Sequence, residues 1–199
     1  MKKIPVSLGE RSYEIVIGHG ILSDLGDAIS RLGLGPKQMI VTSPTLWPLY
    51  GKTVHDSLAS SGFDVSVAIM RDDEESKSLQ TVTSIYDKLL ESEFDRNSGV
   101  VAVGGGVVGD VAGFAAATFM RGIRFVQVPT TLLAQVDSSI GGKTGVNHPK
   151  AKNLVGAFHQ PAAVWTDVFT LQTLPERELR SGLAEVIKYA MIADQELFT

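Results

Sequence analysis

Short apolar runs alternate with segments of helical periodicity along most of the chain, and this alternation limits the possible folds more than any other feature. The runs QMIVT, GVVAVG and FVQVP are rich in β-branched residues and have the length of buried strands. Strands that follow one another through helices pair in parallel and have helices on both faces of the sheet. The sequence therefore predicts an α/β fold built on a parallel sheet.

The expected elements follow from these runs and from the glycines and prolines that end them. The first two strands are close enough to pair as a hairpin around GERS. We expect strands at 3–8, 13–18, 38–42, 64–70, 99–104, 125–129 and 162–167, and helices at 21–34, 47–62, 78–93, 111–120 and 131–140.

The pattern changes after Asp167, where the remaining sequence is helical in character. We expect an α/β domain at 1–174 and the first part of a helical domain at 175–199. The last helical pattern stops without a capping signal, so we expect the chain to be a truncated part of a longer protein.

Composition excludes several classes of partner. The net charge is −4 and the sequence pI about 5.5, so we expect no binding to nucleic acid. The amino terminus does not resemble a signal peptide, and the weakly polar run at 99–120 contains Asp110 and several glycines, so we expect no membrane span. The chain has no cysteine, which fits a reducing cytoplasm.

A glycine turn follows the strand expected at 99–104. Gly104, Gly106 and Gly109 fit the G-x-G-x-x-G spacing, directly after a strand and at the start of a helix. Amides at a helix amino terminus bind phosphate groups, so the turn favours a nucleotide. However, the motif lies after two βα units, and no acidic residue follows at the usual distance for a ribose contact. A tight turn that needs small residues for packing alone remains the alternative.

Charged residues interrupt several apolar segments. Asp110 stands in the helix after the glycine turn, either as a partner of the helix dipole or as a cofactor contact. Thr130 and Thr131 follow the next strand as caps or ligand-binding hydroxyls. Asp137 lies among apolar residues and needs a partner, for which Lys143 or Arg121 is the candidate.

Four blocks resemble the successive signatures of the 3-dehydroquinate synthase family. They are GGGVVGDVAGFAAATFMRGI, VPTTLLAQVDSSIGGKTGVN, KNLVGAFHQP and LPERELRSGLAEVIKY. The similarity runs almost continuously over about residues 99 to 190, and the first hundred residues fit more loosely. It implies a Rossmann-like NAD-binding domain followed by an α-helical domain.

The resemblance also implies an activity. Members of the family convert a seven-carbon sugar acid phosphate, 3-deoxy-D-arabino-heptulosonate 7-phosphate, to 3-dehydroquinate and phosphate in the shikimate pathway. They use NAD catalytically and need a divalent metal, most often zinc, with cobalt as an alternative. Relatives form homodimers. We therefore expect a cytoplasmic lyase of aromatic amino acid biosynthesis.

Site residues are carried over by position. Glu74 and Lys77 resemble the contacts to the adenosine end of NAD, and Ser43 stands where relatives carry a stronger ribose partner. The resemblance assigns the rest of the cofactor site to Gly104, Gly105, Gly106, Asp110, Thr130, Thr131, Lys143 and Lys152. It assigns the substrate site to Arg121, Asp137, Lys143, Lys152, Asn153 and Lys188.

The metal assignment is incomplete. Glu185 resembles the single carboxylate ligand, and it lies three residues before Lys188, hence on the same helix face. Catalytic zinc takes three protein ligands, and the family's two histidine ligands lie further along the chain. We interpret His159 as a packed histidine. We therefore expect the isolated chain to be inactive.

Three other functions stay open. The chain could be a related sugar phosphate cyclase or a metal-dependent polyol dehydrogenase, a nucleotide-binding module without catalysis, or a purely structural domain. The dehydrogenase would release reduced NAD, and the module would bind NAD without releasing phosphate. The structural domain leaves unexplained why Asp110, Asp137, Lys143 and Lys152 interrupt apolar segments.

Overall fold

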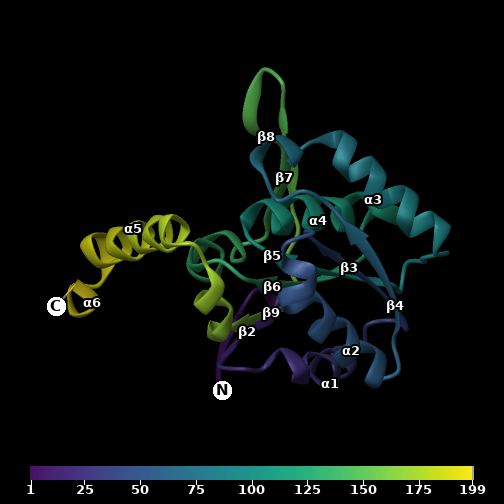
Figure 1. Ribbon diagram of the computed structural model, residues 1–199, viewed down its shortest axis with the longest axis horizontal. Helices are drawn as coiled ribbons and strands as arrows, with labels where there is room; N and C mark the ends of the chain where they lie inside the picture. Colours follow the sequence, from purple (N-terminus) through teal and green to yellow (C-terminus); the bar gives the residue numbers. More distant parts are fainter. Residues whose placement is uncertain (199) are drawn as a thin grey trace.

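The computed structural model describes residues 1–198 and has a seven-stranded sheet in the order β1-β2-β9-β6-β5-β3-β4 (Figure 1). The antiparallel pair β1–β2 stands at one edge, and every other neighbouring pair is parallel. This confirms the predicted α/β class. The strands are β1 (Lys2–Val6), β2 (Tyr13–Gly18), β3 (Lys37–Thr42), β4 (Asp64–Ile69), β5 (Gly99–Gly104), β6 (Arg124–Pro129) and β9 (Ala163–Asp167).

Helices cover both faces of the sheet. On one side lie α1 (Leu25–Ser30) and α2 (Lys52–Ser60), and on the other lie α3 (Leu79–Glu91) and α4 (Gly106–Thr118) (Figure 1). Short helical turns lie in the connections between the strands and helices. They are η1 (Gly9–Arg11), η2 (Leu22–Asp24), η3 (Trp47–Gly51), η4 (Glu74–Ser76) and η5 (Phe119–Arg121).

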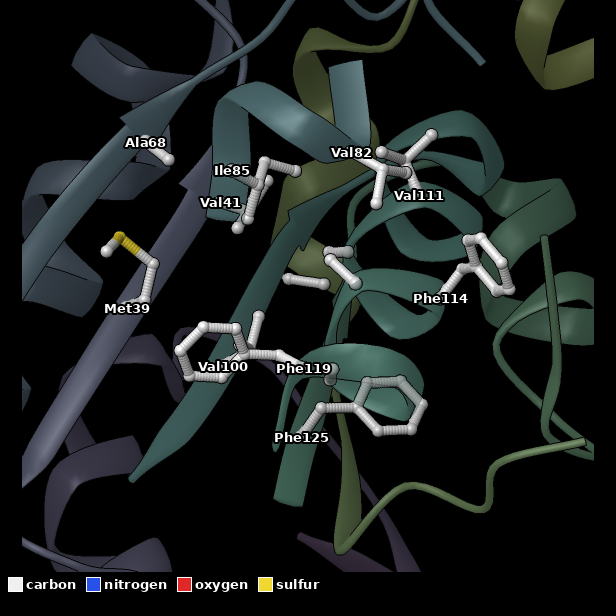
Figure 2. Packing of buried hydrophobic residues seen from close by; sticks show 14 of the residues in the cluster. Met39, Val41, Ala68, Val82, Ile85, Val100, Val111, Phe114, Phe119 and Phe125 are labelled. Carbon is white, nitrogen blue, oxygen red and sulfur yellow. The ribbon is translucent and has the colours of Figure 1, made fainter. Parts of the chain in front are cut away.

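The strand sequences explain this layering. Every residue of β5 is buried, as expected for a central parallel strand that has helices on both sides. Val100 faces α3 and α4, where it joins Val82, Phe114 and Phe125 (Figure 2), whereas Val101 faces α1 and α2. The alternation of the strand thus divides its valines between two cores.

A two-stranded hairpin was not predicted. β7 (Lys143–His148) and β8 (Ala151–Phe158) pair antiparallel and project from the body of the protein (Figure 1). No strand was expected from the sequence between residues 140 and 162. Glycine, asparagine and lysine are depleted in strands, and Pro149-Lys150 is not one of the dipeptides that favour a tight hairpin turn, so the local signal was weak.

Two predicted helices are shorter than expected. The segment at 21–34 contains only η2 and α1, and the one at 131–140 forms a π-helical turn, η6 (Ala134–Ser138). Both segments contain Ser and Asp, and the first also contains Gly; these residues favour turns and caps over continuous helix.

The sequence after β9 is helical, as predicted, with η7 (Val168–Thr173), α5 (Glu176–Ala193) and α6 (Gln195–Phe198). Helix α5 extends away from the sheet (Figure 1). The boundary near residue 174 stays a prediction. No helix in the described residues is both long and apolar enough to cross a bilayer.

Candidate functional site

The glycine turn lies between β5 and α4 as the sequence predicted. A Cβ atom on Gly104 would come within 2.6 Å of the Val108 side chain, so the turn has no room for a side chain there. Gly105 precedes the first turn of α4 and caps it without a side chain. The first amides of a helix have no carbonyl partner inside it, so the start of α4 presents free donors and the positive end of the helix dipole.

A first cavity of about 630 Å³ opens at this helix start. Its wall includes Gly105, Gly106, Thr130, Thr131 and Tyr50. A volume of this size is within the usual range for a small-molecule or cofactor site.

Two hydroxyls in the cavity wall lack partners. Thr130 is 2% exposed, and its hydroxyl makes no hydrogen bond within the described residues. The hydroxyl of Ser138 also makes no hydrogen bond within the described residues, and its Oγ would lie 3.0 Å from a Cβ atom on Gly106. Buried hydroxyls normally have partners, so both are suited to a polar ligand. Thr131 Oγ1 instead accepts a hydrogen bond from the amide of Ala134 at 3.2 Å.

A buried lysine joins three segments of the site. Lys77 lies directly after η4, is 8% exposed, and has its Nζ atom 2.5 Å from Oδ2 of Asp110 in α4. The same ammonium group donates to Oδ1 of Asn153 in β8 at 2.7 Å. Burial raises the pKa of Asp110, and the hydrogen bond from Lys77 opposes that rise.

A second, more exposed network surrounds this lysine. Asn147 donates its side-chain amide to Oε1 of Glu74 at 2.7 Å and accepts the backbone amide of Asn153 at 3.0 Å. Lys152 lies at the rim, with its Nζ atom 3.9 Å from Oε1 of Glu74. The loop after β4 and the tip of the hairpin are thereby held together.

A second cavity of about 570 Å³ lies on the other side of Lys77, against the hairpin. Its wall includes Asp137, Lys143, Asn153 and Leu154. The walls of both cavities share Lys77, Asp110 and Ser138.

Asp137 has a different partner from those expected. Its Oδ1 atom accepts a hydrogen bond at 3.1 Å from the hydroxyl of Tyr189 in α5. The expectation that Lys143 or Arg121 pairs with Asp137 is therefore wrong in this structure. Asp137 is only partly buried at the edge of the second cavity, so it does not need a full counter-charge.

Glu185 and Lys188 contact each other on one face of α5, as their spacing predicted. The hydrogen bond from Lys188 lowers the pKa of Glu185, so this carboxylate is ionised at neutral pH. Partial burial and the acceptors Asp137 and Glu185 raise the pKa of Tyr189 to about 12.

The structure brings most of the predicted residues together and leaves some apart. Ser43 is fully buried, and its hydroxyl accepts the amide of Leu46 at 3.3 Å, so it caps the following turn and does not face the first cavity. Glu74 and Lys77 both lie in the wall of the first cavity, where Lys77 pairs with Asp110. Arg121 is exposed after α4, outside the lining described for both cavities. His159 is packed against Phe125, with ring centroids 5.3 Å apart, as interpreted.

Sequence reasoning missed Ser138, Asn147 and Tyr189. Ser138 lies in the quoted DSSI segment directly after Asp137, so its position beside a predicted site residue was the available signal. Asn147 and Tyr189 join the site only through the fold. Asn147 reaches it because the hairpin lies against η4, and Tyr189 reaches it because α5 lies against the turn at Ala134–Ser138.

The residues present fit NAD at the first cavity. The bare glycine turn and free helix amides suit a diphosphate, and the unpaired hydroxyl of Thr130 suits a polar cofactor atom. A metal site is not complete, because no three His, Cys, Asp or Glu side chains gather within the described residues. Glu185 would supply one ligand of the usual three.

A family model described as 3-dehydroquinate synthase N-terminal matches residues 67–181. The chain is 58% identical over 198 residues to a 3-dehydroquinate synthase of Pelotomaculum thermopropionicum, covering 100% of this chain and 53% of that protein. It is 57% identical over 198 residues to the enzyme of that name from Geobacter metallireducens, covering 100% of this chain and 55% of the relative. The chain thus spans about half the length of these curated relatives.

Solved structures of other enzymes are similar to this chain as well. A 2-deoxy-scyllo-inosose synthase complexed with carbaglucose-6-phosphate, NAD⁺ and Co²⁺ matches with a TM-score of 0.89 and 29% identity, covering 96% of this chain and 52% of that one. The 2-epi-5-epi-valiolone synthase of Streptomyces hygroscopicus subsp. jinggangensis 5008, with NAD⁺ and Zn²⁺ bound, matches with a TM-score of 0.86 and 35% identity, covering 97% and 53%. A glycerol dehydrogenase of Schizosaccharomyces pombe shares the fold, with a TM-score of 0.70 at 18% identity over 89% of this chain and 42% of that one. On the match to its amino-terminal model, which spans more than half of these residues, the chain belongs to the 3-dehydroquinate synthase family.

Proposed function

We propose that this chain is the cofactor-binding part of a 3-dehydroquinate synthase, which converts 3-deoxy-D-arabino-heptulosonate 7-phosphate to 3-dehydroquinate and phosphate. The observation that carries the proposal is the pair of adjoining cavities, one at the glycine turn and one beside Lys143 and Asn153. An NAD-dependent reaction on an anionic sugar needs such an arrangement, with the cofactor and the substrate side by side.

The chain's own residues bind and orient. The start of α4 would hold the cofactor diphosphate, with Thr130 and Ser138 as further donors. Lys143 and Lys152 would attract the carboxylate and phosphate of the substrate, on a protein whose net charge is −4. Asn153 would hydrogen-bond a substrate oxygen. Bound NAD would supply a hydride acceptor for the carbon that bears a substrate hydroxyl, and the same cofactor would later return that hydride.

The metal would be divalent, with zinc as the first choice. The two solved relatives described above carry Co²⁺ and Zn²⁺, which supports the class of metal. Glu185 is ionised and partly buried, as a ligand should be. The other ligands would come from polypeptide other than these 199 residues. The exposed apolar stripe Leu183, Ile187 and Met191 on α5 supports a covering partner for this helix.

The oligomeric state, the class of substrate and the cellular compartment belong to the same proposal. A homodimer is supported by the projecting hairpin, on which Leu154 and Phe158 are 77% and 81% exposed. The acidic net charge supports a small-molecule substrate and not nucleic acid. The absence of cysteine supports the cytoplasm.

The activity can be tested by adding the part of a relative that this chain does not span. The chain would be assayed alone and fused to the part of the Pelotomaculum relative that lies beyond the aligned segment, with NAD, zinc and the sugar acid phosphate. We expect the fusion to release phosphate without net NADH and the chain alone to release none. Glu185→Gln in the fusion is the matched control and should lower turnover by at least a hundredfold.

A polyol dehydrogenase is the second candidate, because such enzymes share the fold. Accumulation of NADH with a polyol, and no phosphate release from the sugar acid phosphate, would favour it and overturn the synthase proposal.

A further inference from the structure

Lys77 occupies an unusual position for a lysine. Its side chain is 10% exposed, whereas that of Lys88 in the following helix is 55% exposed. A buried ammonium group needs charged or polar partners, and Lys77 has two, Asp110 and Asn153. These partners come from different parts of the fold, helix α4 and the hairpin.

The two partners differ in the cavities that they line. Asp110 is in the wall of both cavities, whereas Asn153 is in the wall of the second cavity and not of the first. The ammonium group of Lys77 therefore forms part of the partition between the proposed cofactor and substrate spaces. Its two short contacts link Asp110, which lines both cavities, to Asn153, which lines only the second of them.

The backbone supports this arrangement at the hairpin. Asn153 has φ of 58°, a left-handed conformation that asparagine tolerates better than most residues. The backbone amide of Asn153 donates to the side-chain oxygen of Asn147. The backbone amide of Asn147 in turn donates to the carbonyl oxygen of Lys77 at 2.7 Å. The side chain of Asn153 is thus aimed at Lys77 from a fixed backbone.

We propose that Lys77 is a positioning residue that couples the two cavities, holding Asp110 for the cofactor and Asn153 for the substrate in one geometry. This rests on the proposed function for the identity of the two ligands. It differs from the expectation that Lys77 contacts the adenosine end of the cofactor. Its specific consequence is that a change at Asn153, outside the first cavity, weakens NAD binding through Lys77.

The test is a double-mutant cycle on the whole chain, with NAD affinity measured by calorimetry. Asn153→Gly removes the acceptor for Lys77 and keeps the left-handed backbone. We expect it to weaken NAD binding about tenfold, the effect of losing one hydrogen bond to a charged group. In a Lys77→Met background the same change should have no further effect, because the coupling is already lost.

Two further variants separate positioning from a general loss of structure. Asn153→Asp keeps an oxygen acceptor and a residue type that tolerates positive φ, so it should recover part of the affinity lost in Asn153→Gly. Lys88→Met changes an exposed lysine and should leave NAD affinity unchanged. If Lys77→Met does not fold, Asn153→Gly and Asn153→Asp still decide, because both keep the buried pair of Lys77 and Asp110.

The outcomes are distinct. Wild-type affinity in Asn153→Gly, or an equal loss in both backgrounds, would overturn the coupling. Failure of the unmodified, folded chain to bind NAD would count against the proposed function itself.

Discussion

Tyr189 in α5 donates its hydroxyl to Asp137 beside the second cavity, across 3.1 Å. This bond ties the helical segment that carries Glu185 to the α/β part of the chain. Tyr189 is partly buried and lies near two carboxylates, which explains why its pKa rises from 10.0 to about 12.

The raised pKa of Tyr189 predicts a late tyrosinate signal. We expect the absorbance difference between the wild type and Tyr189→Phe to develop around pH 12, not pH 10. The sign of the linkage follows: the contribution to folding stability is complete below pH 10 and is lost as pH rises toward 12. A difference signal with its midpoint near pH 10 would show that the bond to Asp137 is absent in solution.

Asp167 at the end of β9 is predicted to be a strong structural anchor. It is 1% exposed and accepts the backbone amides of Gly20, Ile21 and Phe169 at 2.7–3.0 Å. Asp167→Ala leaves these amides unpaired and should lower the free energy of unfolding by about 3 kcal/mol, measured by urea denaturation. Asp64→Ala, an exposed aspartate at the start of β4, is the control and should change it by less than about 0.5 kcal/mol. An equal loss of unfolding free energy in Asp167→Ala and Asp64→Ala would contradict the role of Asp167 as a structural anchor.

The hairpin is predicted to depend on Gly156. A Cβ atom there would lie 2.1 Å from the carbonyl oxygen of Thr144 on the paired strand. Gly156→Ala should therefore push the strands apart and speed amide hydrogen exchange in Lys143–Phe158. Phe158→Ala, at a side chain 81% exposed, should leave exchange in the rest of the hairpin unchanged. Unchanged exchange in Gly156→Ala would mean that the strands are further apart in solution.

The glycines of the turn should differ in their tolerance of alanine. A Cβ atom on Gly104 would meet Val108 at its branched carbon, 2.6 Å away, whereas one on Gly109 would meet the end of the flexible Gln127 side chain at 2.7 Å. We expect Gly104→Ala to cost about 2 kcal/mol of stability and Gly109→Ala less than about 1 kcal/mol, by urea denaturation. The reverse order would contradict this packing.

The fold class and the layers were largely predictable, because the parallel strands are continuous apolar runs separated by helical patterns. The hairpin was not, since β7 and β8 lack a strong local pattern and are held by contacts with α4 and η4. Contacts with segments far away in the sequence therefore determine whether this hairpin forms.

The residue types of the site were predictable, but their pairings were not. The glycine turn and Thr130 lie where the sequence placed them. Lys77 was expected to contact the cofactor, but its partners within the protein, Asp110 and Asn153, lie much further along the chain and were not predicted. A single sequence gives no distance between such residues, so only the fold could assign them.

The central claim is that the glycine turn at the start of α4 binds NAD. The direct test is calorimetric titration of NAD into the chain, with and without zinc, together with Gly105→Asp. The aspartate side chain would enter the space next to Thr131, where a Cβ atom already lies 3.0 Å from Cγ2, and would place a negative charge beside the cofactor diphosphate. Amide hydrogen exchange outside the turn would show that this variant is folded.

We predict saturable NAD binding that zinc leaves unchanged and that Gly105→Asp abolishes. Absence of binding by the folded wild-type chain, or equal binding by the folded Gly105→Asp variant, would contradict the account.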